Sequence, residues 1–435
     1  MLTFLGFAMV ISFMYLIMTK RLSALIALIL VPILFALFGG FYSHIGPMML
    51  EGISKLAPTG VMLMFAILYF ALMIDSGLFD PAVRKILKLV KGDPLKVSVG
   101  TAALALVVSL DGDGATTYMI CCAAMLPLYS RLGMSPRIMA GLIILAGGVM
   151  NMTPWGGPTA RAASALHVDP SDIFVPMIPA MAFGVVAILA IAYLYGKRER
   201  ARLGELHLPT DDIDHSEITV SQFPEARRPK LIWFNGALTA ALMVALIAGA
   251  LPLPVLFMIA FSIAMIVNYP CLQQQKDRIA AHAGSVLAVT GLIFAAGIFT
   301  GILSGTGMVE AMSKSLLAVI PEALGPYLAV ITAIVSMPFT FFMSNDAFYY
   351  GVLPVLSEAA SHYGITPVEM ARASIVGQPV HLLSPLVPST YLLVALAGIE
   401  FGDHQRFTLK WAVLVCLCIM LAALLMGIFP LFSSL

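Results

Sequence analysis

Long apolar runs separated by short polar connections make up most of this 435-residue chain. A helix of about 17–25 apolar residues is long enough to cross a bilayer, so the pattern predicts an all-α polytopic membrane protein with about 11 transmembrane helices. The runs that we expect to span the membrane are residues 2–18, 22–38, 59–75, 138–167, 174–196, 231–250, 254–269, 284–303, 367–398 and 411–432.

Two further apolar segments are each interrupted by a polar insert, at residues 111–117 and 344–346. The first arm of the first segment, residues 97–110, would be about 21 Å long as a helix, which is shorter than a hydrocarbon core of about 30 Å. We therefore predict re-entrant hairpins over 97–130 and 327–357, with tips that stop inside the protein. An ordinary pair of spans joined by a polar turn outside the membrane is the alternative.

The composition supports a membrane protein, because charged residues make up only 11% of the chain against about 25% in soluble proteins. No basic stripe or nucleic-acid motif occurs, so we expect no nucleic-acid partner. If the N-terminus lies outside, most of the 24 Lys and Arg residues fall on the cytoplasmic side. The positive-inside rule thus predicts a multi-pass protein of the cell inner (cytoplasmic) membrane with both termini outside and a cytoplasmic linker at 197–230. The apolar start is expected to be a retained helix and not a signal peptide.

Short sequence patterns recur about 230 residues apart, in the same order and with the same spacing. The matched residues are Pro154 with Pro385, Thr159 with Thr390, and Asp172 with Asp403. Because the crossing helix at 174–196 would deliver the second half upside down, we predict the inverted repeat of many secondary transporters. The predicted halves are residues 1–196 and 231–435.

After each hairpin, closely spaced prolines interrupt a predicted span, first within 138–167 and again within 367–398. Proline prevents a continuous helix, and the second part of a broken helix begins with free backbone N–H groups that favour an anion. We therefore predict a substrate site where the hairpin tips meet the breaks. The predicted substrate-binding residues are Thr116, Asn151, Thr153, Gly156, Gly157, Thr159, Arg161, Ser344, Asn345, His381, Ser384, Ser389 and Thr390.

Ionisable residues at membrane depth are costly and usually functional. Arg161 is predicted either to bind a substrate carboxylate or to pair with Asp111 or Asp113. Asp111, Asp113 and Asp346 are predicted to take part in metal or proton coupling, with helix capping as the alternative. His381 is a candidate for proton coupling, or else a structural hydrogen-bond donor.

Four long motifs resemble one known family, the citrate–divalent metal:proton symporters of the CitMHS family. They are SLDGDGATTYMI (109–120), NMTPWGGPTARAASAL (151–166), MSNDAFYYGVLPVL (343–356) and QPVHLLSPLVPSTYLL (378–393). The resemblance implies an importer of citrate bound to a divalent cation of the Mg²⁺ or Ca²⁺ type, driven by protons, with no permanently bound cofactor. It also implies the fold of the ion-transporter superfamily, with a scaffold that forms a homodimer and an elevator-type transport domain that holds both hairpins.

Two alternatives remain open from the residues. One is a sodium- or proton-coupled carrier of a dicarboxylate or tricarboxylate on the same fold. The other is an intramembrane aspartyl hydrolase that uses Asp113 and Asp346, which would have to share a proton near a scissile bond. The sequence lacks the Gly-x-Gly-Asp pattern of such proteases, because Leu110 and Asp111 precede Gly112. We therefore expect a transporter of a small carboxylate and not an enzyme.

Overall fold

A computed structural model describes residues 1–90, 93–112, 114–204, 223–318 and 321–433, except for the side chains of Met18, Asp111 and Pro224. All regular elements in these ranges are helices. Six of them are long and apolar enough to cross a membrane. Several shorter apolar helices accompany them. The prediction of an all-α polytopic membrane protein is thereby confirmed.

The first part of the chain contains three helices, a short fourth helix, a hairpin, a broken helix and a long final helix. Its elements are α1 (Leu2–Met18), α2 (Ala24–Phe38), α3 (Ile45–Ser76), α4 (Asp80–Val90), α5 (Pro94–Val108), η1 (Ser109–Asp111), α6 (Gly114–Leu132), α7 (Pro136–Met150), α8 (Gly157–Leu166) and α9 (Pro170–Leu203).

The second part of the chain has its elements in a similar order. After the short turns η2 (Pro224–Ala226) and η3 (Pro229–Leu231), they are α10 (Ile232–Ile247), α11 (Leu253–Asn268), α12 (Leu272–Gly305), α13 (Met308–Leu317), η4 (Glu322–Tyr327), α14 (Leu328–Phe342), the π-helix η5 (Ala347–Val352), α15 (Leu353–Ser361), α16 (Pro367–Ser374), η6 (Ile375–Gly377), α17 (Gln378–His381), α18 (Pro388–Ala397) and α19 (Phe401–Leu425).

Several helices extend beyond the apolar runs that predicted them. The span expected at 59–75 begins at Ile45, the one at 284–303 begins at Leu272, and the one at 174–196 continues to Leu203, into the predicted linker. A helix ends where the backbone is capped and not where apolar residues stop. For example, α3 ends at Gly77, whose φ of 83° is left-handed and therefore suits glycine.

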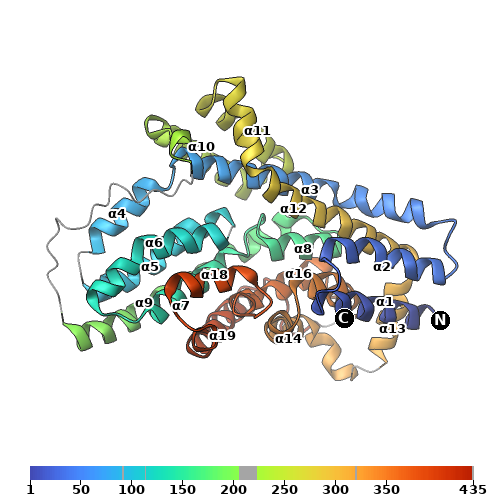
Figure 1. Ribbon diagram of the computed structural model, residues 1–435. Coiled ribbons are helices and arrows are strands. Elements are labelled where there is room, and N and C mark those ends of the chain that lie inside the picture. Colours follow the sequence, from blue (N-terminus) through green and yellow to red (C-terminus); the bar gives the residue numbers. More distant parts are fainter. Residues whose placement is uncertain (91–92, 113, 205–222, 319–320, 434–435) are drawn as a thin grey trace.

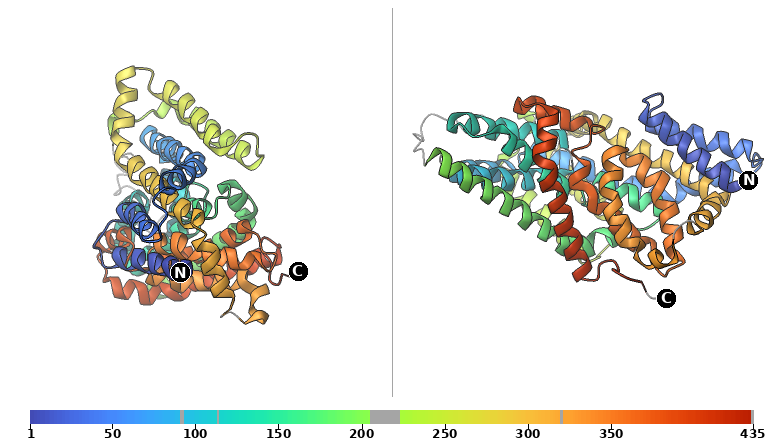
Figure 2. Two further views of the ribbon diagram at one scale, coloured as in Figure 1. Left: turned by 90° about the vertical axis from the view of Figure 1, so that its right-hand side faces the viewer. Right: turned by 90° about the horizontal axis from the view of Figure 1, so that it is seen from below.

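A small hydrophobic cluster of α2, α3 and α12 accompanies two large hydrophobic cores, around which the helices pack. One core consists mainly of residues from α4–α9 and α14–α19, and the other mainly of residues from α1–α3 and α10–α13. Figure 1 shows the corresponding layers, with α3 and α12 above α5–α9, and Figure 2 shows them from two further sides. Both termini lie toward the same end of the long axis in these views.

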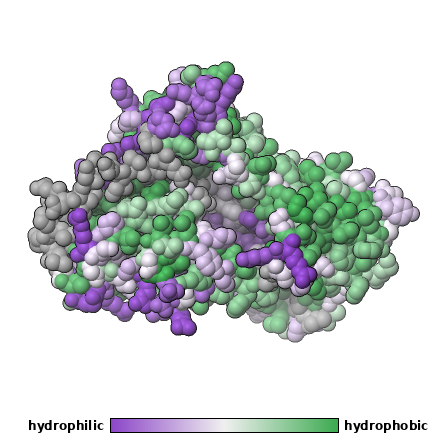
Figure 3. All heavy atoms as spheres, viewed as in Figure 1, coloured by the Kyte–Doolittle hydropathy of each residue, from purple (hydrophilic) through white to green (hydrophobic). Residues whose placement is uncertain are grey.

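Helices α3 and α12 cross with their backbones in close approach. A Cβ atom on Gly52 of α3 would lie only 1.9 Å from the carbonyl oxygen of Gly297, and one on Gly301 would lie 2.3 Å from that of Met48. Small residues at such a crossing allow membrane helices to pack closely. On the outside, hydrophobic residues cover a broad surface over α1 and α2, as Figure 3 shows, and α10 exposes 91% of Trp233.

Candidate functional site

The tip of the first hairpin packs against the first helix break. Helix α5 ends in the short turn η1, and Gly112 follows with a left-handed φ of 80°. The indole Nε1 of Trp155, in the break, donates a hydrogen bond of 2.9 Å to the carbonyl of Leu110. Asp113 and the side chain of Asp111 lie outside the described residues, so their predicted coupling role stays a prediction.

The two breaks are held by the same kind of contact. In the first, the Thr159 hydroxyl donates to the Met152 carbonyl at 3.0 Å. In the second, the Thr390 hydroxyl donates to the Leu382 carbonyl at 2.6 Å. Both threonines are fully buried, so their hydroxyls satisfy carbonyl groups that the broken helices leave without a helical partner. The geometry gives these two predicted binding residues a structural contact.

Glycine and serine residues shape the breaks further. A Cβ atom on Gly156 would lie 2.0 Å from the Asn151 carbonyl oxygen, so the turn requires glycine. The Ser384 hydroxyl donates to the Phe341 carbonyl at 2.6 Å and ties the second break to α14. The hydroxyl of Thr153 is buried and has no hydrogen-bond partner among the described residues.

The central contact of the site is an ion pair between the two parts of the chain. Arg161 on α8 places its Nε 2.6 Å from Oδ1 of Asp346, and the two side chains are 21% and 15% exposed. A second guanidinium nitrogen, Nη1, donates to the Gly157 carbonyl at 3.1 Å. The sequence predicted either a substrate carboxylate or one of Asp111 and Asp113 as the partner of Arg161. Among the described side chains the partner is Asp346, because α8 packs against the helices of the second hairpin.

The tip of the second hairpin lies beside this ion pair. The Ser344 hydroxyl accepts a hydrogen bond from the backbone N–H of Ala347 at 3.2 Å, as a helix cap does. The side-chain oxygen of Asn345 is buried and has no partner in the part of the chain that the structure describes. A buried amide oxygen normally has a partner, so Asn345 is a candidate to contact a bound ligand.

His381 is buried in the second break, where its Nδ1 atom lies 2.7 Å from the Thr340 carbonyl oxygen. Since a carbonyl only accepts, this nitrogen carries the hydrogen. Of the two alternatives given for His381, the geometry favours the structural donor.

A polar chain that the sequence analysis missed joins the two breaks. The Asn151 side-chain amide donates to Oε1 of Gln378 at 3.3 Å. Gln378 in turn donates to the Tyr349 hydroxyl at 3.0 Å, which donates to the Ser374 carbonyl at 3.3 Å. Gln378 is fully buried. Its position as a polar residue within an apolar stretch is the sequence signal that would have found it.

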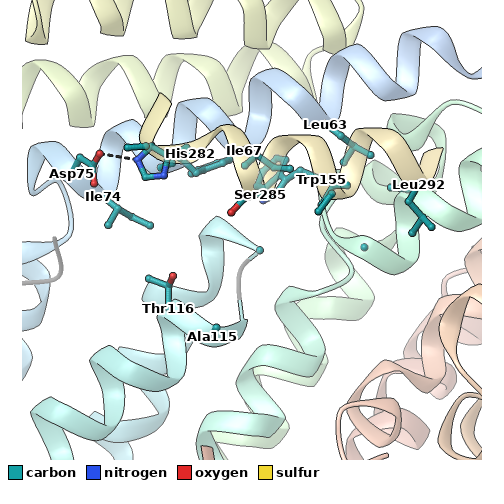
Figure 4. A pocket seen from close by; sticks show the side chains of 18 of the residues that line it. Leu63, Ile67, Ile74, Asp75, Ala115, Thr116, Trp155, His282, Ser285 and Leu292 are labelled. Atoms are coloured by element: carbon teal, nitrogen blue, oxygen red, sulfur yellow. Dashed lines mark hydrogen bonds and ion pairs between the residues drawn. The ribbon is translucent and has the colours of Figure 1, made fainter. Parts of the chain in front are cut away.

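A cavity of about 540 Å³ lies between α3 and α12 on one side and α6 and α8 on the other. Of the predicted site residues, Thr116, Gly157 and Arg161 line it. Figure 4 shows Thr116 below the cavity, and His282 and Ser285 of α12 above it. A second cavity of about 140 Å³ is lined by residues of the first hairpin tip and both breaks, including Asn151 and Ser389.

The wall formed by α3 and α12 carries a charged cluster that sequence reasoning also missed. Asp75, whose side chain is 2% exposed, accepts hydrogen bonds at Oδ2 from Arg278 at 3.2 Å and from His282 at 2.8 Å. Nearby, the Tyr269 hydroxyl donates a hydrogen bond of 2.7 Å to the Ala226 carbonyl.

The cavity offers few groups that would hold a metal ion without help from a ligand. Among the described side chains, no group of three or more His, Cys, Asp or Glu residues is arranged to bind one. On one side the cavity has Arg161, the hydroxyl of Thr116 and the start of α8, and on the other side it has Asp75 and His282. The groups of the first side suit an anion with several oxygen atoms.

Solved structures of two other proteins, the YdaH transporter of Alcanivorax borkumensis and MtrF of Neisseria gonorrhoeae, share the fold. The first has a TM-score of 0.54 at 16% identity and covers 88% of each chain. The second has a TM-score of 0.58 at 14% identity and covers 89% of this chain and 84% of its own.

Two Bacillus subtilis proteins are much more similar in sequence. One, named "Citrate transporter", is 62% identical over 98% of this chain and 99% of its own length. The other, named "Mg(2+)/citrate complex secondary transporter", is 57% identical over the same shares. The sequence model of the CitMHS family, described as "Citrate transporter", matches residues 13–377. These matches confirm the resemblance found in the motifs and exclude the hydrolase, and the chain belongs to the CitMHS family of citrate transporters.

Proposed function

We propose that this protein imports citrate as a complex with a divalent metal ion, by proton symport. The observation that carries the proposal is the Arg161–Asp346 ion pair beside a cavity that has no metal-binding cluster among its described residues. A metal ion entering this cavity must bring most of its ligands with it. Citrate supplies several oxygen ligands at once, and the metal cancels about two of its roughly three negative charges at neutral pH.

The ion pair suggests how the substrate binds. A carboxylate of the complex replaces Asp346 as the partner of Arg161, so the guanidinium exchanges one charge-assisted hydrogen bond for another. Asp346 is then released to accept a proton or to approach the metal ion. This exchange links substrate binding to the second hairpin, because Asp346 stands at that hairpin's tip.

The conformational cycle belongs to the same proposal. The similar order of elements in the two parts supports an inverted repeat, and the two hydrophobic cores support a scaffold of α1–α3 and α10–α13 beside a transport domain of α4–α9 and α14–α19. In this assignment the transport domain shifts along α3 and α12 like an elevator. Both termini lie on the outer side of the inner (cytoplasmic) membrane. The scaffold forms the interface of the homodimer.

Uptake of radiolabelled citrate by proteoliposomes tests the function directly. We expect uptake to require a divalent ion and to increase when the outside is acidic, and we expect Arg161→Gln to abolish it. Uptake driven by a sodium gradient in place of the pH gradient would indicate the sodium-coupled carrier and not the proton symporter. Uptake that is unchanged after all divalent ions are chelated would refute the metal complex as the substrate.

A further inference from the structure

The cavity wall opposite Arg161 carries a histidine that the proposed function does not use. His282 belongs to α12, has a side chain that is 20% exposed, and lines the same 540 Å³ cavity as Arg161. In Figure 4, Asp75 holds the ring of His282 at the cavity wall, above Thr116. The histidine thus lines the cavity that the proposed substrate would enter.

The contact with Asp75 determines which ring nitrogen carries a hydrogen. An ionised carboxylate only accepts hydrogen bonds, so Nε2 of His282, 2.8 Å from Oδ2 of Asp75, is the nitrogen that donates. Arg278 binds the same oxygen at 3.2 Å and supplies a positive charge that balances Asp75. The contact therefore does not require a protonated ring.

The second ring nitrogen, Nδ1, then presents a lone pair. Within the described residues, His282 makes no hydrogen bond other than the one to Asp75. Histidines that bind metal ions usually donate their other N–H to a carboxylate, which fixes the tautomer and the direction of the ring. The Asp75–His282 pair has this arrangement.

We propose that Nδ1 of His282 is a ligand of the divalent ion in the metal–citrate complex. This inference rests on the proposed function. Citrate supplies oxygen ligands, and one water position of the ion is exchanged for the imidazole. Imidazole suits Co²⁺, Ni²⁺ and Zn²⁺, whereas Mg²⁺ and Ca²⁺ prefer oxygen ligands. His282 is therefore a specificity-determining residue that favours transition-metal complexes of citrate.

Transport with two metals tests the role of His282. Citrate uptake with Co²⁺ and with Mg²⁺ is measured in proteoliposomes for the wild type, His282→Ala and His282→Gln. The Gln variant keeps a donor toward Asp75 if the Ala variant folds poorly. We expect the ratio of Co²⁺-dependent to Mg²⁺-dependent uptake to fall about tenfold in both variants. Ser285→Ala, which removes a polar group from the same wall, should leave the ratio unchanged.

A spectroscopic measurement separates this inference from the transport function. Purified wild-type protein is titrated with cobalt(II)–citrate, and we expect a change in the visible absorption of the ion when nitrogen replaces water. His282→Gln should lose this change. An unchanged uptake ratio, or a spectrum that does not differ between wild type and variant, would overturn the role of His282. If wild-type uptake needs no divalent ion, the proposed function itself fails.

Discussion

The crossing of α3 and α12 allows a prediction whose size follows from the structure. Replacing Gly52 by Ala adds a Cβ atom 1.9 Å from the Gly297 carbonyl oxygen and 2.9 Å from the Cα atom of Gly301. Carbon and oxygen atoms in close contact between helices lie about 3.3 Å apart, so the two helices must separate by more than about 1 Å. Overpacking of this kind typically costs about 1–3 kcal/mol, and here backbone atoms cannot rotate away.

A matched control is available on the same helix. A Cβ atom on Gly46 of α3 would meet no other atom within 4 Å, so Gly46→Ala should be neutral or slightly stabilising, because alanine favours helix. The assay is the temperature at which the detergent-solubilised protein loses its monodisperse state, together with citrate uptake. We expect Gly52→Ala to lower this temperature and Gly46→Ala not to. Equal temperatures for the two variants would refute the close crossing.

Three further predictions concern the site. Asp346→Asn removes the carboxylate that competes with citrate for Arg161. Metal-free citrate should therefore bind more tightly by about 1.5 kcal/mol, or about tenfold in Kd. Weaker binding in calorimetry would contradict the proposal that a citrate carboxylate replaces Asp346 at Arg161. Gly156→Ala should abolish uptake, because the new Cβ atom would lie 2.0 Å from the Asn151 carbonyl oxygen; normal uptake would show that the turn is not needed. Trp155→Phe keeps an aromatic ring but loses its hydrogen bond to the first hairpin tip. The variant should take up citrate more slowly, and the lost hydrogen bond should cost only about 1 kcal/mol of stability. A large fall in thermal stability would contradict a role of this hydrogen bond in uptake alone.

The hairpins and breaks show how far sequence reasoning reached. Polar inserts and prolines predicted both features, and the helices of these segments begin and end within a few residues of the predicted bounds. The re-entrant course of the hairpins stays a prediction. In the second hairpin, the turn η4 and helix α14 together cover Glu322–Phe342, which is long enough to span a membrane by length alone.

The partners of the polar side chains were much harder to predict. Arg161 was recognised as important, yet its partner Asp346 is 185 residues away, and no local pattern distinguishes it from the nearer Asp111 and Asp113. Asp75 and His282 were overlooked because each stands near the end of an apolar run, where a charged residue normally faces water. Only the packing of α12 on α3 brings these two residues together at a cavity wall.

The sequence by itself determined the class of protein, because the cost of placing polar groups in lipid restricts long apolar runs to membrane helices. It also determined the family, since the motifs around Asp111, Pro154, Asp346 and Pro385 are long and specific. The tertiary structure decided which polar groups meet. Hydrogen bonds and ion pairs act over about 3 Å, whereas the residues that form them are far apart along the chain. The pair of Arg161 with Asp346 and the ring of His282 held by Asp75 are consequences of helix packing.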